Sequence, residues 1–169
     1  MGARLSLADL AVLDKPAFVH ALGATFEHAD WVAEAVQPRG PFPSVDALHG
    51  AMLSFLLALP YDAQVAFFNQ HPELAGKEAE AGCMTEHSTA EQSALGSLTR
   101  DELAGLRALN AIYRERHGFP FIIAARGHTK AQILEAQRLR VERPTAAEVQ
   151  EAWRQIALIT RMRLDQVVG

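Results

Sequence analysis

The spacing of apolar residues along the chain predicts one helix after another. Asp14 is a typical helix-capping residue and Pro16 suits the first helical turn. The apolar positions that follow have helical spacing: Phe18, Val19, Leu22 and Phe26. A second short helix is expected over residues 28–36. The prolines and glycine between residues 37 and 43 then exclude a helix interior.

A longer helix is expected after Ser44, whose side chain is suited to an N-cap. Its apolar face comprises Leu48, Met52, Phe55, Leu56 and Leu59. Pro60 ends this helix, and Asp62 opens another that reaches Phe68. Residues 69–77 have no helical or alternating periodicity, so we expect an irregular segment there.

Capping boxes mark four later helices. In this motif a Ser or Thr and a Glu or Gln three residues later bond to each other's backbone amides. The pairs are Ser88 and Glu91, Thr99 and Glu102, Thr129 and Gln132, and Thr145 and Glu148. The helix after Thr99 is expected to run to Gly118, because glycine commonly terminates helices.

Residues 119–124 alone have the composition of a strand, and the sequence offers no partner strand, so we expect an extended, buried connector. The predicted fold is therefore all-α: a single compact domain over residues 1–169, with about eight helices and this connector.

Composition narrows the functional classes. The chain is 49% apolar and 21% charged, and its 16 basic and 20 acidic residues give a net charge of −4. Without a basic excess, nucleic-acid binding is not expected. The apolar stretch 51–59 is too short for a bilayer span, no secretory signal is evident, and Cys83 has no second cysteine to pair with. We expect a cytoplasmic protein that binds no membrane.

Several segments carry residues suited to chemistry. His71 precedes Pro72, which favours an extended backbone, so its imidazole either projects into a cleft or bonds to a nearby carbonyl. Ser88 and Glu91 either cap a helix or, with Gln92, contribute to a site at its N-terminus. The connector's backbone groups need partners, from the protein, water or a ligand.

Other patterns give little support for alternative chemistry. Arg161 and Arg163 are two residues apart on a predicted helix, so at most one of them faces a given pocket. The histidines form no recognised metal motif, and no phosphate-binding loop or serine-hydrolase elbow occurs. Metal, nucleotide and serine-hydrolase functions are therefore unsupported.

Taken in order, these segments resemble the 2-oxo-4-hydroxy-4-carboxy-5-ureidoimidazoline (OHCU) decarboxylase family. The matching stretches are His71–Lys77 (HPELAGK), Ser88–Gln92 (STAEQ), Leu109–Tyr113 (LNAIY), Gly118–Ala124 (GFPFIIA) and Ala157–Leu164. The N-terminal half fits more loosely, so the resemblance spans essentially the whole chain.

The resemblance implies an all-helical enzyme that converts OHCU to (S)-allantoin and CO₂ in urate degradation, without metal or organic cofactor, as a homodimer. It implies catalytic roles for His71, Glu91 and Arg163, with Arg161 as the alternative arginine. Substrate contacts are implied for Pro72, Ser88, Thr89, Ala90, Gln92, Phe121, Ile122, Ile123, Ala124 and Ala125.

The implied reaction suits these residue types. The substrate's carboxylate lies next to a ring C=N that accepts the electron pair when CO₂ leaves, so the protein need only position, desolvate and protonate. Histidine suits the proton donor, since its pKa lies near neutrality. Two rival functions remain open: a non-catalytic helical binding module, and a related enzyme acting on another ureido or imidazoline compound.

Overall fold

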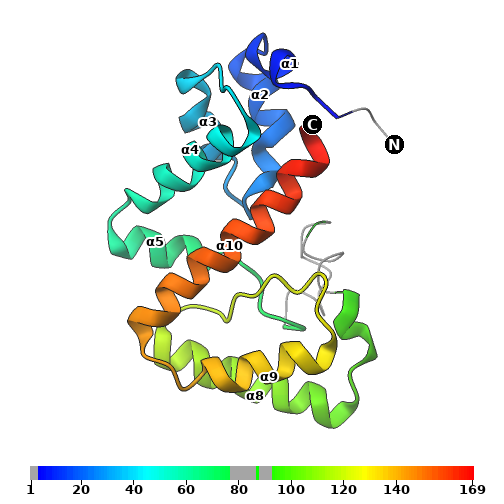
Figure 1. The fold of residues 1–169 in the computed structure, drawn as a ribbon. Coiled ribbons are helices and arrows are strands. Elements are labelled where there is room, and N and C mark those ends of the chain that lie inside the picture. Colours follow the sequence, from blue (N-terminus) through cyan, green and yellow to red (C-terminus); the bar gives the residue numbers. More distant parts are fainter. Residues whose placement is uncertain (1–3, 77–86, 88–92) are drawn as a thin grey trace. The chain divides into compact units, whose positions relative to one another are not determined.

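The computed structural model describes residues 4–76, 87 and 93–169 (Figure 1). Over these residues the chain forms eight α-helices and three 3-10 helices, and the only β pairing there is an isolated bridge between Leu5 and Val168. The predicted all-α class is confirmed. The capping box predicted at Ser88 and Glu91 lies outside the described residues, as does Cys83.

The chain divides into two compact units. The first comprises Met1–Phe67 and Ala157–Gly169, and the second is Phe68–Ile156. The single domain over residues 1–169 stays a prediction.

The first unit consists mainly of short helices. They are α1 (Leu7–Ala11), α2 (Lys15–Leu22), η1 (Gly23–Thr25), α3 (Asp30–Val36), η2 (Gln37–Arg39), α4 (Val45–Leu57) and α5 (Tyr61–Phe68). Asp14 caps α2 by accepting from the Ala17 amide at 2.9 Å, and Ser44 caps α4 by accepting from the Ala47 amide at 3.0 Å. Both predicted caps are confirmed. The second helix begins later than predicted, because His28 has a left-handed backbone with φ 49°.

The core of the first unit lies on the predicted face of α4. Leu48, Met52 and Leu56 are fully buried. The Trp31 ring packs edge-on against Phe55 and Phe67, with ring centroids 5.9 and 6.3 Å apart. The apolar periodicity after Ser44 therefore identified the side that faces the interior.

Residues 4–5 and residues 165–169 are hydrogen-bonded to each other within the first unit. The Leu5 amide donates to the Val167 carbonyl at 2.8 Å, and the Gly169 amide donates to the Leu5 carbonyl at 3.0 Å. Arg4 adds a bond to the Asp165 carbonyl. Residues 4–5 thus lie beside the end of the last helix, α10 (Thr145–Val167).

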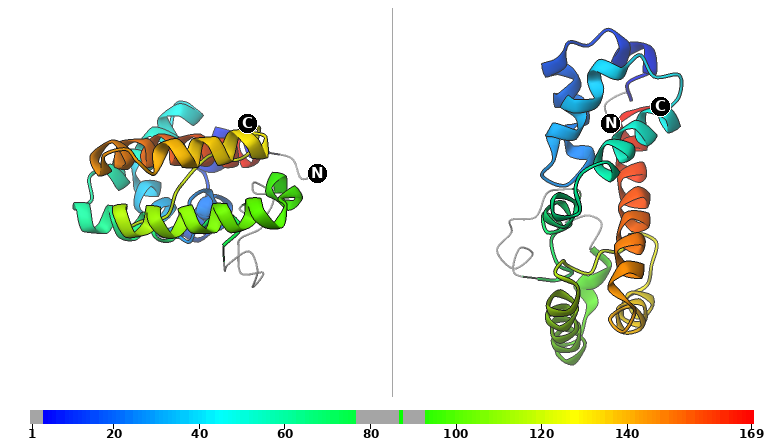
Figure 2. Two further views of the ribbon diagram at one scale, coloured as in Figure 1. Left: turned by 90° about the horizontal axis from the view of Figure 1, so that it is seen from below. Right: turned by 90° about the vertical axis from the view of Figure 1, so that its left-hand side faces the viewer.

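The second unit contains η3 (Ser93–Ser97), α8 (Arg100–His117), α9 (Lys130–Arg140) and the part of α10 (Thr145–Val167) that ends at Ile156. Helices α8 and α9 lie side by side (Figures 1 and 2). Reciprocal capping boxes at Thr99 and Thr129 begin them, as predicted. Gly118 ends α8 with φ 81°, a conformation that a side chain would strain.

The fourth predicted capping box is wrong. Glu148 is fully buried and its carboxylate accepts a hydrogen bond from the Tyr113 hydroxyl instead of capping α10. The amides of Ala147 and Glu148 donate to the Pro144 carbonyl, and the Thr145 hydroxyl shares a hydrogen bond with His117. The Glu148 carboxylate thus bonds to a hydroxyl distant in sequence and not to the local backbone amide that a capping box requires.

None of the described helices is by itself long and apolar enough to cross a bilayer. Helices α4 and α5 reach the necessary length and apolar composition only when taken together, and this pair is bent by 116°.

Candidate active site

His71 lies in the second unit, on the irregular segment that follows α5, where the sequence predicted it. The residue is only 7% exposed. Its backbone amide donates to the Phe68 carbonyl at 3.1 Å, which ties the histidine to the end of α5. Pro72 follows directly and limits the conformations open to the histidine. The imidazole is therefore buried on a short segment with little freedom.

Arg114 of α8 holds this segment on both sides of His71. Its Nη1 donates to Asn69 Oδ1 at 2.9 Å, and its Nε donates to Glu73 Oε1 at 2.7 Å. Asn69 in turn donates to the Gly118 carbonyl at 2.9 Å. One guanidinium thus connects the residues two positions before and two positions after the histidine.

Two more α8 side chains hold the next residues. Asn110 donates to the Leu74 carbonyl at 3.0 Å, and Arg107 donates through two nitrogens to the Ala75 carbonyl, each at 3.2 Å. Ala75 has φ 45°, a strained conformation for a residue with a side chain. Positions 107, 110 and 114 share one face of α8, so the helix fixes the whole His71 loop.

The connector is extended and buried, as predicted. Residues Phe121 to Ala125 have exposed fractions between 2% and 7%. The Ile122 carbonyl accepts a hydrogen bond from Arg140 Nη1 at 2.8 Å, and the Ala124 amide donates to Gln155 Oε1 at 2.9 Å. Side chains of α9 and α10 therefore supply partners that a neighbouring strand would supply in a sheet.

The Phe121 ring is held by two neighbours. The Arg140 guanidinium lies over it, 4.4 Å from the ring centroid, and the Tyr113 ring meets it edge-on at 5.4 Å. Both contacts are favourable geometries for an aromatic ring. Arg140 thus fixes the connector twice, through a ring and through the following carbonyl.

A buried ion pair orients Arg140. Its Nε lies 2.9 Å and its Nη2 2.8 Å from Glu148 Oε2, and the Glu148 carboxylate has no exposed surface. Tyr113 donates to the same oxygen at 2.5 Å, while Arg143 Nη1 lies 3.1 Å from Oε1. Burial, followed by this bond to a carboxylate, raises the pKa of Tyr113 far above its usual value.

Gln155 is oriented in a similar way. Its Nε2 donates to Glu151 Oε1 at 2.7 Å, so the amide oxygen is the atom that faces Ala124. Glu151 also accepts from Arg154 at 2.6 Å. The Arg154 hydrogen bond is the main cause that lowers the pKa of Glu151 to about 2, so Glu151 is an acceptor near neutral pH.

Sequence reasoning missed Arg140, Glu148 and Gln155. The available signal was the connector itself, because a buried extended segment without a partner strand requires polar side chains to satisfy its backbone. The connector's composition indicates that such side chains are needed, but it does not identify the residues that supply them.

The two candidate arginines lie in the first unit and differ sharply. Arg163 is 3% exposed, and its Nη1 lies 3.0 Å from Oε2 of the fully buried Glu27. Arg161 has a side chain 38% exposed and forms ion pairs with Asp46 and Asp165. Of the two, Arg163 is the inward-facing one.

The remaining candidate residues fall outside the described part of the chain. They are Ser88, Thr89, Ala90, Glu91 and Gln92. Within the described residues, no three His, Cys, Asp or Glu side chains are grouped as a metal site would require.

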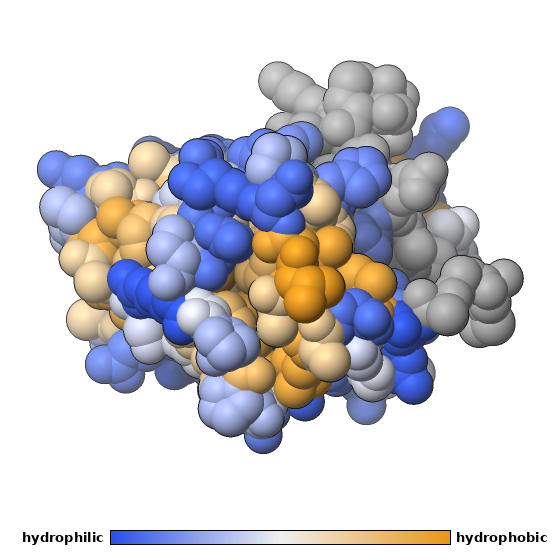
Figure 3. Space-filling view, turned by 90° about the horizontal axis from the view of Figure 1, so that it is seen from above, coloured by the Kyte–Doolittle hydropathy of each residue, from blue (hydrophilic) through white to orange (hydrophobic). Residues whose placement is uncertain are grey.

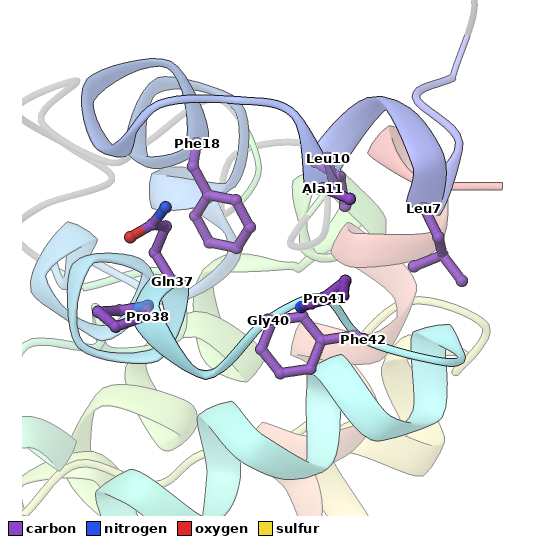
Figure 4. A pocket seen from close by; sticks show the side chains of 9 residues that line it. All are labelled: Leu7, Leu10, Ala11, Phe18, Gln37, Pro38, Gly40, Pro41 and Phe42. Carbon is purple, nitrogen blue, oxygen red and sulfur yellow. The ribbon is translucent and has the colours of Figure 1, made fainter.

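A pocket of about 220 Å³ lies elsewhere in the first unit (Figure 4). Leu10, Phe18 and Phe42 give it an apolar lining, and Gln37 adds a polar group. Figure 3 views the molecule from above, where apolar side chains gather among hydrophilic ones. No candidate residue from the sequence lines this pocket, so its location gives no support to the proposed chemistry.

Comparison with known proteins identifies the family. The family model for OHCU decarboxylase matches residues 11–165. The chain is 36% identical to the 2-oxo-4-hydroxy-4-carboxy-5-ureidoimidazoline decarboxylase of Haloferax volcanii, over 96% of this chain and 95% of that protein. It is 34% identical to the protein of the same name from Mus musculus, over 98% and 94%.

A longer relative is the uric acid degradation bifunctional protein PucL of Bacillus subtilis. It is 34% identical over 96% of this chain, which spans 33% of that protein. Among solved structures, (S)-allantoin synthase matches with a TM-score of 0.79 and 28% identity, over 97% of this chain and 54% of that one. OHCU decarboxylase crystallised with (S)-allantoin has a TM-score of 0.66 at 22% identity, over 91% and 97%, and supports the fold.

The helical fold, the buried histidine loop and these relatives define the class as a small all-α decarboxylase. More particularly, the chain belongs to the OHCU decarboxylase family.

Proposed function

We propose that this chain converts OHCU to (S)-allantoin and CO₂, with His71 as the proton donor. Family membership supports the reaction. The observation that carries the role of His71 is its burial on a loop that Arg114, Asn110 and Arg107 hold to α8. A proton donor must be held in one place to protonate one face of a carbon.

The reaction needs one bond cleavage and one proton transfer. The bond between the ring carbon and the carboxylate breaks, its electron pair moves into the adjacent C=N, and CO₂ leaves. The resulting intermediate then takes a proton on carbon from the His71 imidazolium, which gives a single enantiomer of allantoin. Because the substrate itself accepts the electron pair, the proposal includes no metal or organic cofactor.

Other residues bind and orient the substrate in this proposal. Arg163, whose guanidinium faces inward beside Glu27, holds an anionic group of the substrate. The Phe121–Ala125 backbone and Pro72 contact the substrate, together with Ser88, Thr89, Ala90 and Gln92. Glu91 orients His71 or accepts a ureido N–H. We further propose that the enzyme is cytoplasmic and forms a homodimer. Sedimentation of the purified protein tests the oligomeric state.

The experiment uses OHCU generated freshly from urate with urate oxidase and hydroxyisourate hydrolase. We expect rapid formation of optically active allantoin, followed by circular dichroism, before and after exhaustive chelation. His71→Asn should lower turnover by about 10²–10⁴-fold and leave only the slow, racemic background.

Racemic product at the spontaneous rate with the unaltered chain would refute the proposed reaction. Wild-type turnover and stereospecificity in His71→Asn would instead refute the role of His71. Activity that chelation abolishes and Zn²⁺ or Mg²⁺ restores would overturn the cofactor-free scheme.

A further inference from the structure

The connector uses only one of its two backbone edges to contact α9 and α10. In an extended segment, the N–H and C=O of one residue point to the same side, and those of the next residue point to the other. The Ile122 carbonyl and the Ala124 amide are therefore on a common edge. Arg140 and Gln155 occupy these two groups.

Both partners are themselves held in one orientation. The buried Glu148 carboxylate fixes the Arg140 guanidinium, and the Glu151 carboxylate accepts from the Gln155 amide nitrogen. With its nitrogen committed to Glu151, Gln155 presents oxygen to the connector. A flipped amide would set two donors against each other at Ala124 and two acceptors against each other at Glu151.

The opposite edge is that of Ile123, which lies between the two held residues. Ile123 is 7% exposed, and among the described residues nothing hydrogen-bonds to its N–H or C=O. A buried donor and acceptor without protein partners are costly, and their presence side by side suits a ligand that carries a complementary pair. A ureido group has such a pair, an N–H beside a C=O.

We infer that Gln155 and Arg140 are positioning residues, which turn the Ile123 backbone pair toward the ureido group of the substrate. This inference rests on the proposed function and extends it to residues that do not touch the substrate. Loss of either holding bond lets the connector rotate, so that the ureido group loses its two partners. Binding should then suffer more than the chemical step, because His71 is held separately by α8.

The first test is Gln155→Met, which keeps side-chain length and removes the acceptor for Ala124. We expect KM for OHCU to rise by about tenfold while kcat changes less than about threefold. The double exchange Glu151→Gln with Gln155→Glu restores both hydrogen bonds: the Ala124 amide still donates to the side chain at position 155, and the bond between positions 151 and 155 has its donor and acceptor reversed. It should bring KM back to within about twofold of the original value.

Ile133→Val is the matched control. Ile133 is fully buried on α9, two turns before Arg140, and the change destabilises the unit while leaving the Arg140 and Gln155 side chains unaltered. It should lower thermal stability and leave KM unchanged. If Gln155→Met fails to fold, Glu151→Gln alone serves, because it releases the Gln155 amide to flip and should raise KM by a few-fold.

Three outcomes overturn the inference: an unchanged KM in the position-155 or position-151 variant, a loss that Ile133→Val reproduces, or an exchange that fails to rescue. A direct readout is the amide NMR spectrum of the wild-type protein with (S)-allantoin. The Ile123 amide should shift and the Ala124 amide should not. Failure of the proposed function looks different, because the unaltered chain would then neither turn over OHCU nor bind allantoin.

Discussion

The Tyr113 hydroxyl provides a quantitative test of the buried network in the second unit. Tyr113→Phe removes one atom, and with it the 2.5 Å bond to Glu148. Because the carboxylate has no exposed surface, water cannot replace the lost donor. A hydrogen bond to a charged group contributes about 1.5–3 kcal/mol, so we expect a loss of about 2 kcal/mol in the free energy of unfolding.

For a chain of 169 residues this loss corresponds to a fall in Tm of about 4–8 °C. Urea unfolding followed by far-ultraviolet circular dichroism measures the free energy, and a scan of temperature measures Tm. Tyr61→Phe is the control, because Tyr61 is the other tyrosine of the chain and is 54% exposed. Its substitution should change Tm by less than about 1 °C.

The reasoning is refuted if Tyr113→Phe shifts Tm no more than Tyr61→Phe does. Such a result would mean that Arg140 and Arg143 satisfy the Glu148 carboxylate without the hydroxyl. The slope of the urea transition should be equal in the two variants, since neither alters the surface exposed on unfolding.

Two further predictions concern the arginines and pH. Arg163→Lys should lower turnover of OHCU on the order of 10²-fold, while Arg161→Lys, at an exposed ion pair, should stay within about twofold; the reverse order would transfer the proposed role to Arg161. The pKa of Glu151 is lower in the folded protein than in the unfolded chain, where it is near 4.5. The Glu151 carboxylate therefore stabilises the fold at pH values above about 4.5, and this contribution is lost as the pH falls toward about 2. The lost contribution is about 1 kcal/mol after solvent screening of the exposed Arg154, and Glu151→Gln should remove this part of the pH dependence. The measurement is the fall in urea midpoint between pH 7 and each acidic pH. If this fall is the same in Glu151→Gln as in the unaltered protein, the prediction is wrong.

The sequence predicted contacts between residues close together in the chain and missed those between residues far apart. The caps at Asp14, Ser44, Thr99 and Thr129 each join residues three positions apart, so the pattern contains both partners. At Thr145 the same pattern failed, because Glu148 finds Tyr113, 35 positions away. The start of α3 was misplaced for a different reason, the left-handed backbone of His28, which no periodicity reveals.

The candidate site divides in the same way. His71 and the connector are recognisable as segments, since proline and strand-like composition are local features. The residues that hold them are not, because Arg114, Arg140 and Gln155 read as ordinary polar positions of helices until the fold brings their partners near. Arg163 differs from Arg161 in being buried, and the sequence of two nearby arginines on one helix does not indicate which of them is buried.

The pairing of residues 4–5 with the end of α10 has a practical meaning for protein engineering. Because Leu5 is bonded to Val167 and Gly169, a short peptide is enough to join Arg4 to Gly169. A circularly permuted chain closed here keeps its native neighbours and gains new termini wherever an exposed turn is cut, such as that at Gly127. Reporter domains fused beside Arg4 or Gly169 would likewise emerge from one place on the first unit, where three hydrogen bonds join residues 4–5 to the end of α10.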